Sequence, residues 1–133
     1  MKHVGTKFEF TDQRNANLIA VYRKKLSECK VIRLTDVLKD AVNNPSERFW
    51  VSEERATEVV LKMMRGDQLK KMSPNKREMF QEIFRRTMEA AKMNPRRNIS
   101  LIVASIVDSP APKFYLTPGS AKVIIHNATK GKR

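Results

Sequence analysis

The chain of 133 residues has little cysteine, little glycine and no long apolar run. Its single cysteine, Cys29, excludes an intramolecular disulfide and a cysteine-based zinc site. We therefore expect a cytoplasmic protein that is held together by packing alone.

Four glycines exclude collagen-like and Gly-rich sequences. The longest largely apolar stretch, Leu101–Val107, is far shorter than the roughly 18–20 residues that cross a bilayer, and the first residues lack the apolar run of a secretory signal. No membrane partner is expected.

Acidic residues are also scarce, and this scarcity is uneven. The chain has 27 Lys and Arg against 14 Asp and Glu, for a net charge of +13. Up to Gly66 there are 13 basic and 9 acidic residues, a net of +4, whereas from Asp67 onward there are 14 and 5, a net of +9. Such an excess predicts an anionic partner, with nucleic acid as the first candidate. The second half is expected to contact more of it.

The residue types that carry enzyme chemistry are sparse. His3 and His126 are the two histidines, and neither has a carboxylate or cysteine at metal-ligand spacing. Neither a Gly-rich phosphate loop nor a nucleophile motif is present. We therefore expect no catalytic residue, no metal, no cofactor and no enzymatic activity.

The sequence contains an internal repeat. Identical residues recur at an offset of 65, and they include turn-forming as well as apolar types: Val42 and Val107, Pro45 and Pro110, Phe49 and Phe114, Ala56 and Ala121, Gly66 and Gly131. Upstream, the match continues at an offset of 62, where Tyr22 pairs with Phe84. Because turn residues match as well as apolar ones, we interpret the chain as two degenerate copies of one unit.

Each copy predicts three helices. The first runs from Thr11-Asp12 to about Cys29 and, in copy two, from Ser73-Pro74 to about Met93. The second carries an apolar stripe at helical spacing, and the third is capped by Ser52 or Thr117. The expected fold is therefore all-α, with two tandem, helix-turn-helix-like units at 11–66 and 67–131. Residues 1–10 alternate weakly and fit either a short strand or an N-terminal arm.

The repeated unit resembles, in its general plan, the helix-turn-helix modules that bind DNA, although its connector is longer than their usual turn. The two third helices differ in what they expose. Copy one exposes Glu53, Glu54 and Glu58, which phosphate would repel, whereas the third helix of copy two has no acid. We therefore predict a non-enzymatic DNA-binding protein that places the helix from about Thr117 in the major groove. A role in transcription regulation and a location at the nucleoid would follow.

The predicted nucleic-acid contacts all lie in the second copy. Ser120 allows close approach to a groove, while Lys122, His126 and Asn127 are candidates for base contacts. Thr117 and the first helical turn suit a phosphate. Basic side chains predicted to contact further phosphates are Arg96, Arg97, Lys113, Lys130 and Lys132.

A protein-interaction or assembly module that docks an acidic partner is the alternative. In copy one, Leu61 and Met64 widen the apolar face of the third helix. Packing between the two copies is the favoured explanation for this extra surface, and a partner protein bound by the first unit is the other. RNA binding ranks below both alternatives, and an enzyme ranks last.

Overall fold

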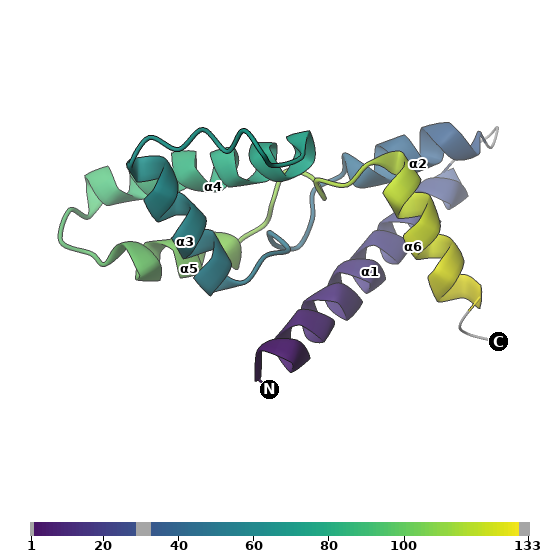
Figure 1. Cartoon of the computed structure of the whole chain (residues 1–133). Helices are drawn as coiled ribbons and strands as arrows, with labels where there is room; N and C mark the ends of the chain where they lie inside the picture. The colour runs from purple at the N-terminus through teal and green to yellow at the C-terminus, as the bar shows by residue number, and fades with distance from the viewer. Residues whose placement is uncertain (1, 29–32, 131–133) are drawn as a thin grey trace.

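The described residues form six helices. The computed structural model describes residues 2–28 and 33–130, with side chains placed for residues 10–28 and 33–128. In chain order the helices are α1 (Lys2–Glu28), α2 (Leu34–Val42), α3 (Glu53–Met64), α4 (Pro74–Met93), α5 (Ile99–Val107) and α6 (Pro118–Lys130) (Figure 1). The described residues form no strand, which confirms the all-α class predicted from the sequence.

The N-terminal segment differs from expectation. Val4–Phe10 lies inside α1, so the prediction of a short strand or arm is wrong. Thr11 and Asp12 are interior residues of that helix instead of its cap. No proline interrupts α1, so nothing sterically ends the helix before this pair. A polar side chain inside a helix is tolerated where it faces solvent, as the exposed Asp12 does.

Most other helix ends lie where the sequence places them. Ser52 caps α3 by accepting a hydrogen bond from the Arg55 N–H, and Pro74 occupies the first turn of α4. Asn98 caps α5 by accepting from the Ser100 N–H. These caps satisfy N–H groups that a helix leaves without internal partners.

The helices form two lobes that do not follow the order of the sequence copies. We call α1, α2 and α6 the terminal lobe, and α3, α4 and α5 the central lobe. Among the described residues, α6 contacts α1 and α2, whereas α3 contacts α4 and α5 (Figure 1). The third helix of each copy is thus packed on the other copy. The expected helix-turn-helix pairing of α5 with α6 is not formed, because these helices make no contact.

The third helices exchange copies where two connectors cross: residues 43–52, between α2 and α3, and residues 108–117, between α5 and α6. Ser46 and Ala111 form an antiparallel bridge there, with their backbones hydrogen bonded in both directions. Farther along, Phe49 N donates to Val107 O at 3.1 Å and Phe114 N donates to Val42 O at 2.9 Å. Ser46 and Ala111 are equivalent positions of the two copies, because they are 65 residues apart. The same offset relates Phe49 to Phe114 and Val42 to Val107, so the two hydrogen bonds are equivalent as well. The two halves of the chain are therefore related by a pseudo-two-fold arrangement at the connectors.

Each connector places one phenylalanine in the lobe that its own third helix joins. Phe49 is fully buried in the central core with Val59, Val60 and Ile83. Phe114 is buried in the terminal core, which also contains Leu18, Leu38, Val42 and Ala121. Burying an aromatic side chain of this size contributes about 1.5–3 kcal/mol. These two residues therefore fix the crossing in place.

The extra apolar residues of α3 are not buried between the two copies as expected. The helix packs on the second copy through Ala56, Val59 and Val60, all fully buried. Leu61 and Met64 remain 38% and 48% exposed, so the prediction that packing between the copies buries them is wrong. Ala56, Val59 and Val60 form the packed face of α3 without Leu61 and Met64, because they repeat at helical spacing.

Candidate nucleic-acid interface

Helix α6 is held on the terminal lobe by one apolar face. Ala121 is fully buried, and Ile124 and Ile125 pack against the terminal core. At the N-terminal end, the Thr117 hydroxyl accepts a hydrogen bond from the Ser120 N–H at 3.0 Å. Thr117 therefore acts as a helix cap, which orients the first turn of α6. Its predicted role as a phosphate ligand stays a prediction.

The opposite face of α6 is open to solvent. Ser120, Lys122, His126 and Asn127 are all exposed there, and Val123 is 58% exposed. The structure thus brings the predicted base-contacting residues together on one helix, and neither lobe covers them. No residue of this helix is acidic, so nothing on its own surface opposes the approach of phosphate.

The equivalent helix of the other lobe carries a different surface. Glu53, Glu54 and Glu58 are exposed on α3, and the carboxylate of Glu58 pairs with both Arg55 and Lys62. The 65-residue offset places Pro118, Gly119 and Val123 of α6 at the positions of these three acids. The pseudo-symmetric scaffold therefore presents one helix with neutralised charge and one with free positive charge.

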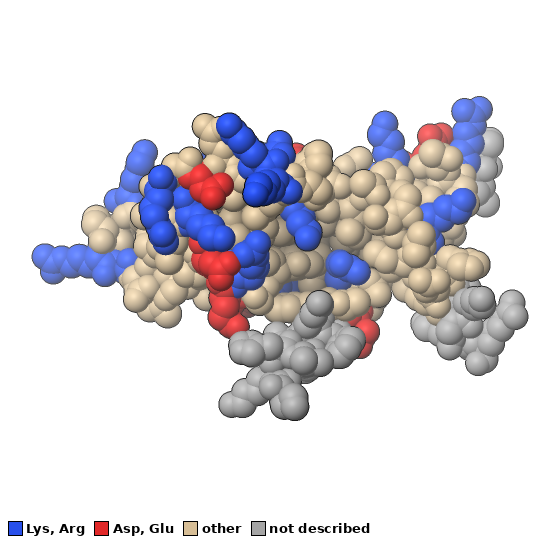
Figure 2. Space-filling view, viewed as in Figure 1, with Lys and Arg blue, Asp and Glu red and all other residues tan. Residues whose placement is uncertain are grey.

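Some basic side chains of the central lobe are paired with acids or with backbone carbonyls. Figure 2 shows basic side chains over this lobe interspersed with acidic ones. Glu82 accepts hydrogen bonds from Arg85 and Arg86, both at 2.7 Å. Hydrogen bonding to Arg85, followed by that to Arg86, lowers the pKa of this carboxyl against the opposing effect of burial. Arg77 donates to three backbone carbonyls of the loop before α4 and so braces that loop.

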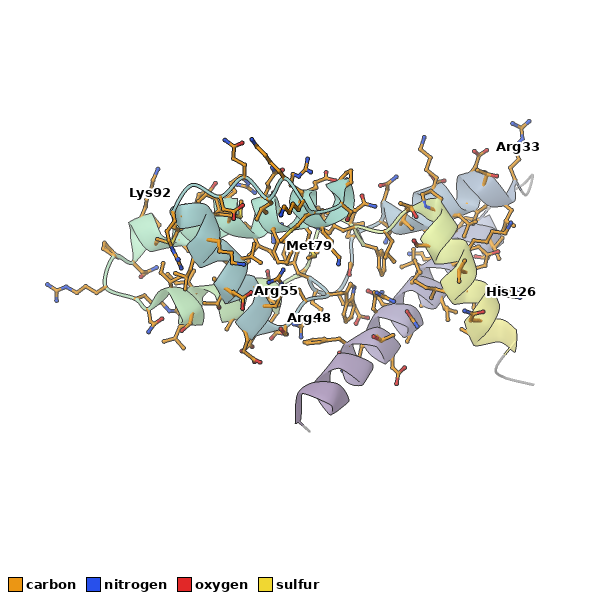
Figure 3. The ribbon with its side chains drawn as sticks, viewed as in Figure 1. Arg33, Arg48, Arg55, Met79, Lys92 and His126 are labelled. Carbon is orange, nitrogen blue, oxygen red and sulfur yellow. The ribbon has the colours of Figure 1, made fainter. Side chains whose placement is uncertain are left out.

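Arg33 is a basic residue of the terminal lobe that the sequence analysis did not single out. It is exposed at the start of α2, beside Leu34. A cavity of about 240 Å³ is lined by Leu34 together with Lys122 and His126. Figure 3 shows Arg33 and His126 at one end of the molecule and Lys92 at the other. The sequence alone does not predict that Leu34 lies beside Lys122 and His126, because this arrangement depends on the packing of α6 against α2.

The predicted phosphate contacts are dispersed. Arg96 and Arg97 are exposed on the α4–α5 loop, at the end of the central lobe farthest from α6 (Figure 1). Lys113 lies on the connector before α6, where its ammonium pairs with Glu78 at 2.7 Å. Lys130 ends α6, and its side chain lies outside the described part, as do Lys132 and Cys29. Among the described side chains, Arg96 and Arg97 therefore lie apart from α6.

Comparison with protein-family models, curated proteins and solved structures finds no match to this chain. Within residues 2–28 and 33–130, no helix combines the length and apolar character needed to cross a bilayer. The described side chains also contain no group of three or more His, Cys, Asp or Glu residues placed to hold a metal ion. A proposal for function therefore depends on the surface of α6 and its surroundings.

Proposed function

We propose that the protein binds double-stranded DNA without catalysing a reaction, and that the exposed face of α6 enters the major groove. The observation that carries this proposal is the exposure of Ser120, Lys122, His126 and Asn127 on a helix without acidic residues. An α-helix fits the major groove of B-form DNA, where base edges present distinct donors and acceptors. The major groove could not accommodate a helix that was buried between the lobes.

The chemistry of these side chains supports contact with bases. Gly119 and Ser120 near the start of α6 are small and allow the backbone to approach a groove closely. Lys122 donates hydrogen bonds to acceptors such as guanine O6 and N7, and Asn127 suits the paired donor and acceptor of adenine. His126 supplies another polar group one turn beyond Lys122. These residues form the base-reading part of the proposed interface.

Phosphate contacts come from cations around α6 in the same lobe. Arg33 is exposed at the start of α2, which packs directly against α6. Such residues position a protein on the duplex without reading its sequence. Arg96 and Arg97 lie at the other end of the molecule, so the proposed interface does not include them. Lys113 contributes less in this proposal, because Glu78 already neutralises it.

A salt titration of duplex binding tests the proposal. If about six phosphates are engaged, affinity falls about a thousandfold between about 50 and 200 mM salt. Lys122→Glu is expected to weaken binding by about tenfold or more, because it places a negative charge where phosphate approaches. Lys62→Glu is the matched control, since Lys62 is an exposed lysine on the equivalent helix α3 and already pairs with Glu58.

Failure to bind any duplex at low salt would overturn the proposal. Equal losses for Lys122→Glu and Lys62→Glu would also count against α6 as the contacting helix. Circular dichroism of both variants checks that each retains its helices.

Docking of an acidic partner protein is a second candidate, favoured by the cavity under α6. Tyr22, Leu34, Leu38 and Ile125 supply its apolar lining, and Lys122 and His126 supply polar groups. An apolar cavity with cationic edges fits an apolar side chain flanked by acids. Leu34→Asn separates the candidates, because Leu34 is 43% exposed and lines the cavity, and the new side chain is polar without adding charge beside Lys122. The substitution is expected to abolish partner docking and to leave duplex affinity within about twofold.

A further inference from the structure

A second, smaller cavity lies where the two lobes meet. Its volume is about 80 Å³, and it is lined by residues of both halves of the chain. Arg14 of α1 and Lys76 of α4 supply two cations, while Trp50, Phe114 and Tyr115 supply aromatic walls. Met79, another lining residue, marks its position between the lobes in Figure 3. None of the lining residues is acidic.

The lining residues come in equivalent pairs from the two sequence copies. Arg14 and Lys76 are related by the 62-residue offset of the first helices, and Trp50 and Tyr115 by the 65-residue offset of the connectors. The cavity is therefore situated at the pseudo-two-fold arrangement that relates the two halves of the chain. Two cations from equivalent positions approach the same cavity, which is an arrangement suited to a single anion held between them.

The charge on Arg14 is incompletely compensated. Its side chain is partly buried, and burial lowers the pKa of the guanidinium. Its Nε and Nη2 atoms donate to the neutral amide oxygen of Asn15 at 3.3 and 3.2 Å. Lys113 lies over the ring of Tyr115, with its ammonium 5.6 Å from the ring centroid, but it already pairs with Glu78. Arg14 and Lys76 therefore remain as the cations that face the cavity.

We propose that this cavity binds a phosphate group between Arg14 and Lys76. A cavity of about 80 Å³ has room for an anion as small as phosphate. A guanidinium donates two parallel hydrogen bonds to phosphate oxygens, and an ammonium adds a point charge. A cation is excluded by the two positive side chains. This site is separate from α6 and does not depend on duplex binding.

The single tryptophan of the chain provides a direct readout, because Trp50 lines the cavity. Inorganic phosphate is titrated into the full-length protein at constant ionic strength, with chloride as the reference anion, and tryptophan fluorescence is recorded. A saturable change with phosphate but not with chloride is the expected result. Phosphate is also expected to raise the midpoint of thermal unfolding, since a ligand that binds the folded state stabilises it.

Two substitutions test the assigned cations. Arg14→Gln and Lys76→Gln are each expected to weaken phosphate binding by about tenfold or more, because each removes a charge-assisted contact. Arg23→Gln is the matched control, as Arg23 is an exposed arginine of the same helix that does not line the cavity. Without phosphate, Arg14→Gln is expected to unfold at the same or a higher temperature, since it removes a partly buried charge.

The source of the phosphate group is distinguished by a second titrant. Competition by dimethyl phosphate at this site would identify a phosphodiester, as in a nucleic-acid backbone, whereas binding of inorganic phosphate alone would identify a free phosphate or a monoester. The proposal is overturned if phosphate and chloride give the same fluorescence response. Unchanged phosphate affinity in both Arg14→Gln and Lys76→Gln would overturn it as well.

Discussion

The indole Nε1 of Trp50 donates a 2.6 Å hydrogen bond to the hydroxyl oxygen of Ser46, a side chain that is only 2% exposed. The same hydroxyl donates to the backbone carbonyl of Arg48 at 2.9 Å. Ser46 also forms the bridge to Ala111 through its backbone. One small residue therefore joins the two connectors through its backbone and holds the following aromatic residue through its side chain.

Replacing Ser46 by alanine is expected to destabilise the fold by about 1–3 kcal/mol, because the partly buried indole N–H and a carbonyl lose their partner. Chemical denaturation followed by circular dichroism measures this loss. Ser105→Ala is the control, since Ser105 is an exposed serine inside α5 and its replacement is expected to change stability by less than about 0.5 kcal/mol. A loss at Ser46 no larger than at Ser105 would show that the hydroxyl is dispensable.

The two lobes are expected to unfold together. Leu18→Ala in the terminal core and Ile83→Ala in the central core each remove a fully buried side chain and should cost about 2–5 kcal/mol. Because each connector enters the core of one lobe from a helix of the other, both substitutions should shift one common transition. Tryptophan fluorescence and far-ultraviolet circular dichroism are compared during denaturation. Two separated transitions in either variant would contradict this coupling.

Tyr115 makes stability sensitive to alkaline pH. Burial, followed by the charges of Glu82 and Glu78, raises the pKa of its phenol from 10.0 to about 12. A raised pKa in the folded state contributes stability that is complete below pH 10 and is lost as pH rises toward about 12. The difference in unfolding free energy between the wild type and Tyr115→Phe should therefore be constant below pH 10 and fall above it. A constant difference across this window would be evidence against burial of the phenol.

Arg96 and Arg97 test whether a bound duplex extends beyond the terminal lobe. These arginines lie on the α4–α5 loop, at the opposite end from α6 (Figure 1). Changing both to glutamine is expected to leave the salt dependence of duplex binding unchanged, whereas Arg33→Gln should reduce the slope by about 0.9 for one lost phosphate contact. A reduced slope in the double arginine variant would show that DNA also contacts the central lobe.

The sequence predicted which residues are buried better than it predicted their neighbours. The α2 stripe of Val37, Leu38, Ala41 and Val42 is buried as its spacing indicates. Leu34 belongs to the same stripe, yet it is 43% exposed. Hydrophobic periodicity identifies the face of a helix that packs, but it carries no information about the helix that covers it. The third helices of two similar copies carry similar stripes, so the pattern is compatible with either pairing.

The candidate interface could likewise be predicted only in part. The acid-free face of α6 could be predicted, because removing the buried stripe from the sequence leaves Lys122, His126 and Asn127. The packing of α2, which Arg33 precedes, against α6 could not be predicted, nor could the distance of Arg96 and Arg97 from α6. Both depend on the exchange of α3 and α6. The cavity between Arg14 and Lys76 likewise requires the crossing of the connectors, which no local pattern encodes.

The exchange of third helices also affects the order of assembly during synthesis on the ribosome. The central lobe is built from α3, α4 and α5, which are consecutive, and its core also contains Tyr115 of the following connector, so it can close once that residue has emerged. The helices α1 and α2 are made before this lobe, but they must wait for α6 to cover their apolar faces. The terminal lobe is therefore completed after the lobe that is encoded inside it, and Leu18 and Leu38 stay uncovered by α6 until that helix has been made.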